Sequence, residues 1–371
     1  MRRDGVSYKQ IFLEEKQYTM IGTIIISLLV FGFLIFIHEF GHYITARIFN
    51  VTIKEFSIGM GPKLAWYESK KTGITYGVAM FPIGGYVAMV GEDEESDDPN
   101  AFNKKPAWQR LIITAAGATV NIVAGFLAML LLVIFTDVGG TVYAMPVTDE
   151  DMATIENVDI SYRSEDYGFV NGDRIVSING KKIKLDSELD YQISRFGHEP
   201  VDVVVMRDGN LVTLEDVRFP IVEQQGQVFG IRDFKVYRVE KNFFNVFSIS
   251  FRKAALIMRM CWESIFDLIT GRYTVEAISG PVGISSAIGT AAKQNFGSLV
   301  NIAVLISMNL GFMNLLPIPA LDGGRIVMIL AEMITRKKIP SNVEAMINGI
   351  GLALLLLLSV VIMFKDIIGL F

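Results

Sequence analysis

Two histidines separated by three residues are the first candidates for chemistry: the chain reads His38-Glu39-Phe40-Gly41-His42 near the end of a long apolar run. Residues four apart lie on one face of an α-helix, so both imidazoles can bind one zinc ion, with Glu39 beside the open coordination position. The chain has only 3 histidines, and ionisable groups beside an apolar run are costly unless they act together. A helix that merely carries these polar residues is the alternative, and the pattern favours a zinc site.

A third ligand is expected far along the chain, where Asn314-Leu-Leu-Pro317-Ile-Pro319-Ala-Leu-Asp322-Gly-Gly interrupts another apolar run. Prolines and glycines open the backbone there, which a membrane tolerates only where the chain is buried in protein or lines a wet cavity. An aspartate at such a break is a functional candidate. Asp322 would supply the oxygen ligand that the histidine pair lacks, leaving the fourth position to water.

The composition indicates a membrane protein. The 371 residues are 51% hydrophobic and have room for about two or three compact units. A lone cysteine, Cys261, excludes an intrachain disulfide and a thiolate metal cluster. The net charge of -5 gives no reason to expect a nucleic-acid partner.

Four apolar runs approach the about twenty residues that cross a bilayer. They are expected at about 21–49, 108–135, 299–316 and 347–364. Residues 1–19 are polar, lack a signal-peptide cleavage site, and are expected to be a disordered extension or an upstream start. The predicted fold is a polytopic α-helical membrane protein with a membrane-associated β-region and one soluble α+β domain. Its expected parts are residues 1–19, 20–136, 140–240, 241–297 and 298–371.

The connection between the first two spans predicts a small sheet. Gly59-Met60-Gly61-Pro62 reads as a turn, and Thr75–Met80 and Gly85–Val90 read as short strands. Both strands are apolar on two faces, which suits either a hairpin near the metal or an ordinary sheet at the membrane surface. The acidic residues 92–98 are expected to form a solvated loop. In the second span, Gly117-x-x-x-Asn121 indicates close helix packing, and a role for Asn121 in the site stays open.

Residues 140–240 read as the soluble domain. A strand is expected at 174–178, a helix at about 187–194, and a hairpin at 201–206 and 211–217. Residues 244–269 carry aromatic and aliphatic side chains at helical spacing opposite charged ones, which predicts an amphipathic helix on the membrane or on the spanning helices.

The distribution of basic residues predicts the orientation. The positive-inside rule puts the zinc ligands towards the cytoplasm and residues 140–240 outside. The basic residues that flank the first and last membrane loops carry this argument: Lys54, Lys63, Lys70, Lys71, Lys104, Lys105, Arg110, Arg325, Arg336, Lys337 and Lys338. Basic residues before Met20 count mildly against it.

The two motifs, in this order and in two spanning helices, resemble the bacterial site-2 proteases of the RseP and RasP type, which are intramembrane zinc metalloproteases of the M50 family. The resemblance covers nearly the whole chain from Met20. It implies zinc held by His38, His42 and Asp322, with Glu39 as general base. It also implies that substrate is held by Asn309, Asn314, Pro317, Pro319, Gly84 and Gly85.

The soluble domain resembles one PDZ domain through Gly168-Phe-Val-Asn-Gly-Asp-Arg-Ile, and a single copy is closer to the RasP-like branch. The polar residues 156–167 leave a steric filter at least as plausible as binding of peptide termini. The family further implies a bacterial cytoplasmic (inner) membrane and single-pass substrates, such as anti-sigma factors or remnant signal peptides. An upstream site-1-type protease would act on the same substrate.

The expected chemistry is peptide hydrolysis. Zinc makes water nucleophilic near neutral pH, and Glu39 takes its proton and passes it to the leaving amine. One alternative is a membrane-anchored metallopeptidase acting on soluble peptides, whose third ligand would be a Glu or His on a soluble helix. The other is a PDZ-bearing scaffold or transporter with a silent metal site. The set His38, Glu39, His42 and Asp322 favours the intramembrane protease.

Overall fold

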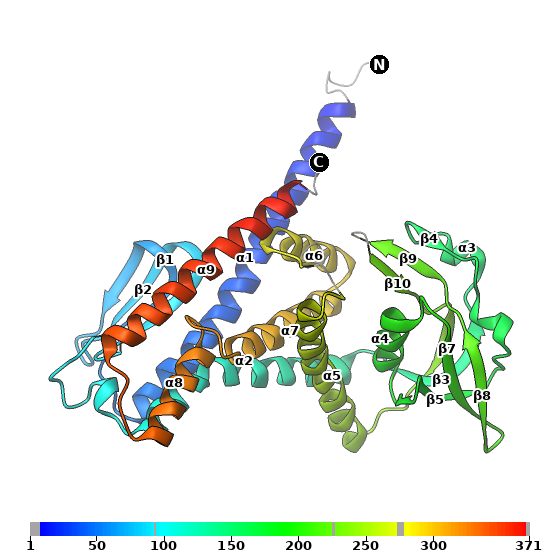
Figure 1. Cartoon of the computed structure of the whole chain (residues 1–371). Helices are drawn as coiled ribbons and strands as arrows, with labels where there is room; N and C mark the ends of the chain where they lie inside the picture. The colour runs from blue at the N-terminus through cyan, green and yellow to red at the C-terminus, as the bar shows by residue number, and fades with distance from the viewer. Residues whose placement is uncertain (1–7, 93, 225–226, 273–277, 369–371) are drawn as a thin grey trace, which may run out of the picture. The chain divides into compact units, whose positions relative to one another are not determined.

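The computed structural model describes residues 8–92, 94–224, 227–272 and 278–368. The chain divides into two compact units: Met1–Ala128 with Ser279–Phe371 form the first, and Met129–Ile278 form the second (Figure 1). The first unit therefore unites segments from both ends of the chain.

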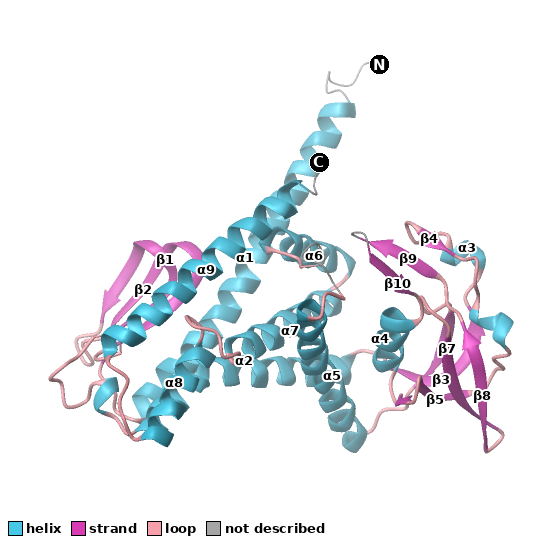
Figure 2. Cartoon of the chain, in the orientation of Figure 1, coloured by secondary structure: helices cyan, strands magenta, loops and turns pink. Residues whose placement is uncertain are grey.

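Helices dominate the first unit (Figure 2). They are α1 (Tyr8–Ile48), α2 (Ala107–Phe135, with its last residues in the second unit), α6 (Pro281–Gln294), α7 (Phe296–Asn314), α8 (Asp322–Thr335) and α9 (Ser341–Ile368). Four stretches in the described part of the chain are long and apolar enough to cross a membrane: Met20–Ile48, Ala107–Phe135, Phe296–Asn314 and Asn342–Asp366. These agree with the four predicted spans and confirm a membrane protein.

Three expectations about these helices need correction. Residues 8–19 continue α1 as helix and do not form a disordered extension; residues 1–7 lie outside the described part. Helices α6 and α8 were not predicted. The glycines after Asp322 suggested an open loop, but they form the first turn of α8. Glycine is needed there because a side chain would collide with the neighbouring backbone.

The β-region consists of β1 (Ile53–Glu68) and β2 (Thr75–Met89). Residues 53–58 pair with residues 85–89 on one side and with 75–78 on the other, while 63–68 pair with 75–79. The predicted turn at 59–62 is thus a bend within β1, where Gly59 and Gly61 have φ of 88° and 92°. The bend lets two strands build a sheet four segments wide.

A buried apolar cluster attaches this sheet to the helices. It joins the end of α1, the sheet, the short 3-10 helix η1 (Phe102–Lys104) and the start of α2 through Ala46, Val51, Ile53, Phe56, Ile74, Val87, Met89, Phe102 and Ile113. The cluster fixes β2 beside the half of α1 that carries the histidines.

The second unit contains a larger sheet in the order β11-β3-β5-β7-β8, with β6 paired to β5, and a smaller sheet in the order β10-β9-β4. The predicted strand, helix and hairpin are present as β5, α4, β7 and β8. The elements are β3 (Gly139–Pro146), α3 (Asp149–Met152), β4 (Val158–Asp159), η2 (Ser164–Tyr167), β5 (Arg174–Ile178), β6 (Lys181–Lys182), α4 (Asp186–Phe196), β7 (Val201–Arg207), β8 (Asn210–Val217), β9 (Ile221–Gln224), β10 (Gln227–Gly230), β11 (Phe234–Arg238) and α5 (Phe243–Ile269).

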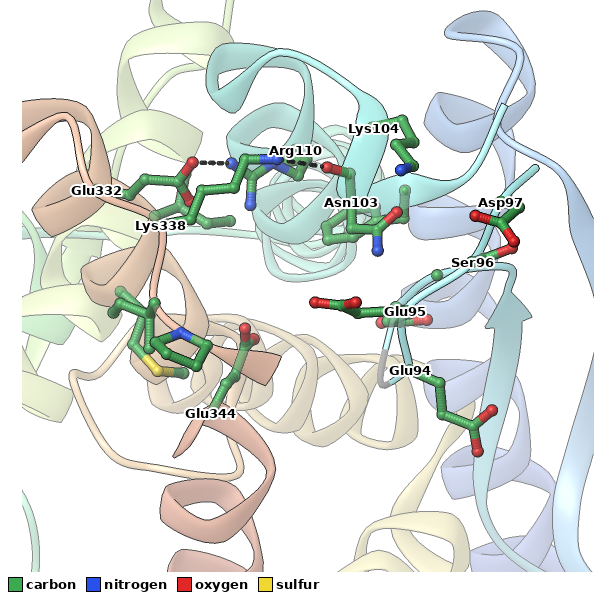
Figure 3. Close-up of a pocket in the computed structure, with 17 residues that line it drawn as sticks. Glu94, Glu95, Ser96, Asp97, Asn103, Lys104, Arg110, Glu332, Lys338 and Glu344 are labelled. Carbon is green, nitrogen blue, oxygen red and sulfur yellow. Dashed lines mark hydrogen bonds and ion pairs between the residues drawn. The ribbon is translucent and has the colours of Figure 1, made fainter. Parts of the chain in front are cut away.

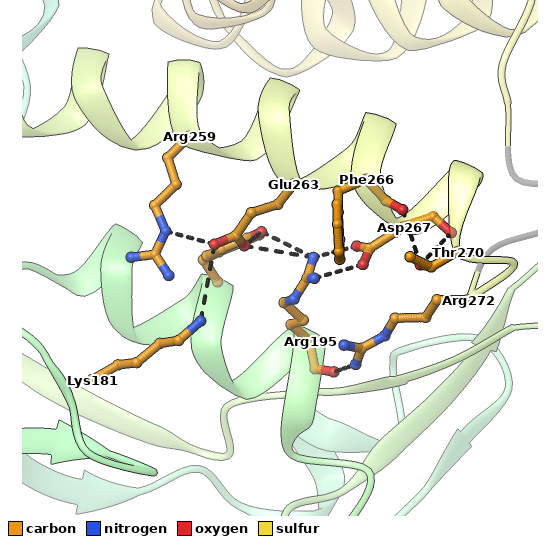
Figure 4. A network of polar contacts seen from close by, with 9 residues as sticks. Lys181, Arg195, Arg259, Glu263, Phe266, Asp267, Thr270 and Arg272 are labelled. Atoms are coloured by element: carbon orange, nitrogen blue, oxygen red, sulfur yellow. Dashed lines mark hydrogen bonds and ion pairs between the residues drawn. The ribbon is translucent and has the colours of Figure 1, made fainter.

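Helix α5 is joined to α4 by a network of charged side chains (Figure 4). Arg195 Nη2 donates to Asp267 Oδ1 at 2.7 Å. Glu263 accepts from Tyr191 and, at 2.8 Å, from Arg259 Nε. Away from this network, α5 exposes Phe243, Phe244, Phe247, Phe251 and Trp262. The predicted amphipathic helix is therefore present, with its polar face turned to α4.

Candidate metal centre

Three potential ligand atoms in the first unit lie at the corners of a nearly equilateral triangle. His38 Nε2 and His42 Nε2 are 3.3 Å apart, and Asp322 Oδ2 lies 3.3 Å from the first and 3.4 Å from the second. Tetrahedral zinc with bonds of about 2.0–2.1 Å separates its ligands by about 3.3 Å. The side lengths of the triangle therefore match one zinc ion bound by all three residues.

The surroundings of Asp322 also fit a cation. Its Oδ2 is buried and has no hydrogen-bond donor among the described residues. A buried polar atom left without a partner costs about 1–3 kcal/mol, and a metal ion removes that cost. Two imidazole nitrogens and one carboxylate oxygen form a donor set that zinc accepts, with one position left for water.

Each histidine is oriented by a group on the far side of its ring. His42 Nδ1 lies 2.8 Å from the carbonyl oxygen of Ile113. Because a carbonyl only accepts, Nδ1 carries the proton and Nε2 presents its lone pair to the metal position. Such outer partners fix the tautomer of metal-ligating histidines.

The corresponding partner of His38 is Asn121, which is fully buried on α2. Its side-chain amide lies 3.3 Å from His38 Nδ1, and its Oδ1 has no hydrogen-bond partner among the described residues. Both groups are satisfied when the amide oxygen faces His38 Nδ1 and accepts its proton, which leaves Nε2 free for metal. The amide of Asn314 lies 3.5 Å from the same nitrogen.

Glycines let the backbones approach the site. A Cβ on Gly117 would lie 2.3 Å from His42 Nε2 and 2.8 Å from His38 Nε2, and one on Gly41 would lie 2.6 Å from the carbonyl oxygen of Ala116. A side chain at residue 117 would thus occupy the space in front of both imidazoles. The motif that predicted close helix packing also keeps this space open.

The turn between α7 and α8 brings Asp322 to the histidines. Ala320 has a φ of 72°, which is unusual for a residue with a side chain, and its amide donates to Asn348 Oδ1 at 3.3 Å. A Cβ on Gly323 would lie 2.0 Å from the carbonyl oxygen of Leu316. Only glycine permits this tight turn, which makes Asp322 the first residue of α8.

The three ligands lie in a cleft of about 740 Å³. Of the predicted site residues, it is lined by His38, Glu39, His42, Gly84, Gly85, Asn314 and Asp322. Gly85 packs against Glu39, because a Cβ on Gly85 would lie 3.0 Å from Glu39 Cγ. The cleft lining does not include Asn309, which is exposed on α7, or Pro317 and Pro319. Pro319 instead packs against Gly351 of α9.

Sequence reasoning left the role of Asn121 open, assigned Gly117 to helix packing only, and missed the Ile113 carbonyl. Gly117 and Asn121 are four residues apart on α2, so they share a face. A buried asparagine in a membrane-spanning helix indicates that its side-chain amide forms a hydrogen bond with another polar group. The sequence alone does not show that this group is an imidazole of another helix.

Comparison with known proteins agrees with this geometry. The model of peptidase family M50 matches residues 26–358. The chain is 33% identical to a Clostridium acetobutylicum protein named "Putative zinc metalloprotease" over 93% of this chain and 97% of the relative. It is 26% identical to the regulator of sigma-W protease RasP of Bacillus subtilis over 95% and 99%. It is also 27% identical to the zinc metalloprotease RasP of Bacillus licheniformis over 94% and 100%. With its zinc-compatible cluster and four long apolar helices among the described residues, this protein belongs to peptidase family M50, the site-2 proteases.

Proposed function

We propose that this zinc metalloprotease hydrolyses peptide bonds within or near the membrane-spanning segments of single-pass membrane proteins. The observation that carries the proposal is the position of His38 and His42 inside the apolar stretch Met20–Ile48 of α1. A protease of soluble peptides has no need to place its ligands in such a segment, since burying ionisable groups there is costly.

The residues of the cleft divide the chemistry between them. Zinc, when bound, polarises a peptide carbonyl and makes a water nucleophilic near neutral pH. Glu39 neighbours the ligand His38 and faces the cleft, where it accepts a proton from the attacking water and returns it to the leaving amine. His38, His42 and Asp322 hold the ion, and Asn121 and Ile113 keep the imidazoles oriented.

The substrate segment is expected to bind as a strand beside residues 85–89 of β2. A helical segment keeps its amides in internal hydrogen bonds, so it has to unwind before its peptide bond is accessible. Among the described residues, 85–89 pair with β1 on one side only, and residues 84–89 line the cleft. Strand addition at such an edge supplies main-chain hydrogen bonds to an extended peptide.

The decisive test of activity uses Glu39→Gln. A purified single-pass model protein is incubated with wild type, with Glu39→Gln, and with Glu68→Gln as a control, since Glu68 is exposed on β1. We expect cleavage by wild type and the control, loss of cleavage in Glu39→Gln with its zinc retained, and inhibition of wild type by a zinc chelator. Equal rates for wild type and Glu39→Gln would contradict the assigned base.

The proposal includes a location and an orientation. The protein would lie in the bacterial cytoplasmic membrane, with the metal centre towards the cytoplasm and the PDZ-like domain (residues 140–240) outside. There this domain would filter substrates by size or bind their termini after an upstream protease has trimmed them, which is regulated intramembrane proteolysis. Support comes from the basic residues near the first and last membrane loops and from the similarity to RasP proteins.

Orientation is tested by labelling introduced cysteines in intact cells after Cys261→Ala. We expect a membrane-impermeant maleimide to label Asn210→Cys, in the exposed β7–β8 hairpin, after removal of the cell wall. Lys337→Cys, exposed after α8, should react only once the membrane is permeabilised. The reverse pattern would overturn the orientation.

A further inference from the structure

Three mostly buried charged side chains are linked beside the cleft, and two of them, Glu92 and Arg325, line it. Arg325 lies on α8 one turn after Asp322, and its Nε donates to Glu344 Oε1 at 3.1 Å. Its Nη1 donates to Glu92 Oε1. We call Glu92, Arg325 and Glu344 the clasp. It ties together the loop after β2, the helix that begins with Asp322, and α9.

The clasp also reaches the strand beside which substrate is expected to bind. The amide of Val90 donates to Thr52 O on the β1 side at 2.9 Å. Because successive amides of a strand point to opposite sides, the amide of Met89 points to the open side. It donates there to Glu92 Oε2 at 3.4 Å. A carboxylate of the clasp therefore occupies the hydrogen-bonding position at the end of the open edge.

A second cavity is lined by two members of the clasp, Glu92 and Glu344 (Figure 3). It measures about 430 Å³, Glu92 lines both it and the cleft, Arg325 lines the cleft, and Glu344 lines the cavity. Charged side chains of both signs surround it, and they include Glu94, Glu95, Asp97, Lys104 and Lys338. A hydrophilic peptide segment suits such walls, whereas an apolar one would leave their charges without water.

We propose that the clasp ends the substrate-binding edge and sets the distance between the cleaved bond and the hydrophilic flank of the substrate. This inference rests on the proposed function. Gly85 lies beside Glu39 and Met89 beside Glu92, and four residues of strand span about 13 Å. A bound strand accordingly extends about four residues from the cleaved bond before it meets the clasp. Beyond that point the chain turns into the charged cavity.

The clasp limits how far substrate extends along the strand and takes no part in the cleavage step. Variants of its residues therefore show which charge or hydrogen bond sets that limit. Glu92→Gln removes the charge but keeps an oxygen for the Met89 amide, whereas Glu92→Ala removes both. Glu344→Gln weakens the other arm of Arg325 and leaves Glu92 in place. Each position is outside the ligand set, so zinc content should stay at the wild-type level in all three variants.

The test uses model substrates in which a leucine-rich single-pass segment is followed by its first lysine at about two to about eight residues from the cleaved bond, with a separate series for each flank. On one flank, wild type should cleave fastest at a spacing of about four residues. Glu92→Ala should shift the optimum outward by about two residues, the repeat of a strand edge, mainly through KM. Glu344→Gln should keep the wild-type optimum. The optimal spacing for Glu92→Gln should lie between those of wild type and Glu92→Ala.

Either of two spacing results would overturn the inference: the same spacing profile in Glu92→Ala as in wild type, or a flat profile in wild type on both flanks. Loss of zinc from Glu92→Ala would also overturn it, because the residue would then support the metal site. If wild type cleaved no member of either series, the proposed function itself would fail, and this inference with it.

Discussion

Two buried clusters of ionisable side chains, one in each unit, satisfy their charges in different ways. In the second unit, Asp267 and Glu263 face the cation of Arg195, and every carboxylate in the network has a donor (Figure 4). In the first unit, Asp322 Oδ2 faces two imidazole nitrogens and has no donor within the described residues. The same kinds of side chain thus form a closed network in one place and an open triangle in the other.

The comparison shows how to tell a structural cluster from a metal centre. In the closed network every carboxylate oxygen has a donor once the chain has folded, although Arg195 Nε has no partner among the described residues, so the network stabilises the contact between α4 and α5. An open triangle is complete only when a cation fills it, since unpaired buried polar atoms are costly. Removing a member should therefore affect folding in the first case and metal content in the second.

The largest effect is expected for Asp322→Ala. Mutating a hydrogen-bond partner of a zinc ligand lowers metal affinity by up to about 100-fold. Loss of a ligand itself should lower zinc affinity by more than that, and cleavage should fall with it. Zinc content of the purified protein, measured by mass spectrometry, checks this expectation. Thr335→Ala, at an exposed position on the same helix, is the control. Unchanged stoichiometry in Asp322→Ala would show that the triangle is not the metal centre.

Arg195→Met should have the next largest effect, on folding alone. It leaves Asp267, whose side chain is only 4% exposed, without its cation, and removing one partner of a buried pair costs about 3–5 kcal/mol. The double variant Arg195→Met, Asp267→Leu should recover most of that stability. Thermal unfolding and zinc content, measured together, test this. Zinc lost in parallel with stability would remove the distinction between the two clusters.

Asn121 is the hydrogen-bond partner of the zinc ligand His38, and its variants measure how much this partner contributes to zinc affinity. Asn121→Leu should lower zinc affinity by about 10–100-fold, because His38 Nδ1–H loses its acceptor. Asn121→Asp keeps an oxygen in that position and should retain most of the affinity. Competition with a zinc-binding dye compares the two variants. If Asn121→Asp bound zinc as weakly as Asn121→Leu, the amide nitrogen, and not the oxygen, would face His38.

The smallest effect is a pH dependence in the closed network. Burial raises the pKa of Glu263, but hydrogen bonds from Tyr191 and Arg259 and the charge of Lys181 outweigh it, so the pKa lies below its ordinary value. A lowered pKa in the folded state adds stability above the unfolded value of about 4.3, and this stability is lost as the pH falls through the folded value.

The measurement is the gap in unfolding temperature between wild type and Glu263→Gln. A charged hydrogen bond contributes about 1.5–3 kcal/mol, so wild type should be the more stable protein at neutral pH. The gap should narrow below a pH of about 4. A gap that stayed constant or widened on acidification would contradict the lowered pKa.

Prediction from sequence succeeded where neighbouring residues alone determine the structure, as in an apolar run or in a motif whose spacing places side chains on one face of a helix. Apolar runs located the four membrane-spanning candidates, and the spacing of His38 and His42 placed two imidazoles on one face. Partners from distant elements were less accessible. The match of Asn121 to His38, the opening left by Gly117, and the clasp around Arg325 depend on how α1, α2, α8 and α9 pack, and no local pattern encodes that packing. Substrate contacts from Asn309, Pro317 and Pro319 stay predictions.

X-ray absorption at the zinc edge of the purified protein tests the metal centre most directly. We expect a first shell of two imidazole nitrogens and oxygen ligands at about 2.0–2.1 Å, with one carboxylate contribution that is absent from Asp322→Ala loaded with excess zinc. A shell containing sulfur, or a spectrum identical in wild type and Asp322→Ala, would contradict zinc binding by His38, His42 and Asp322.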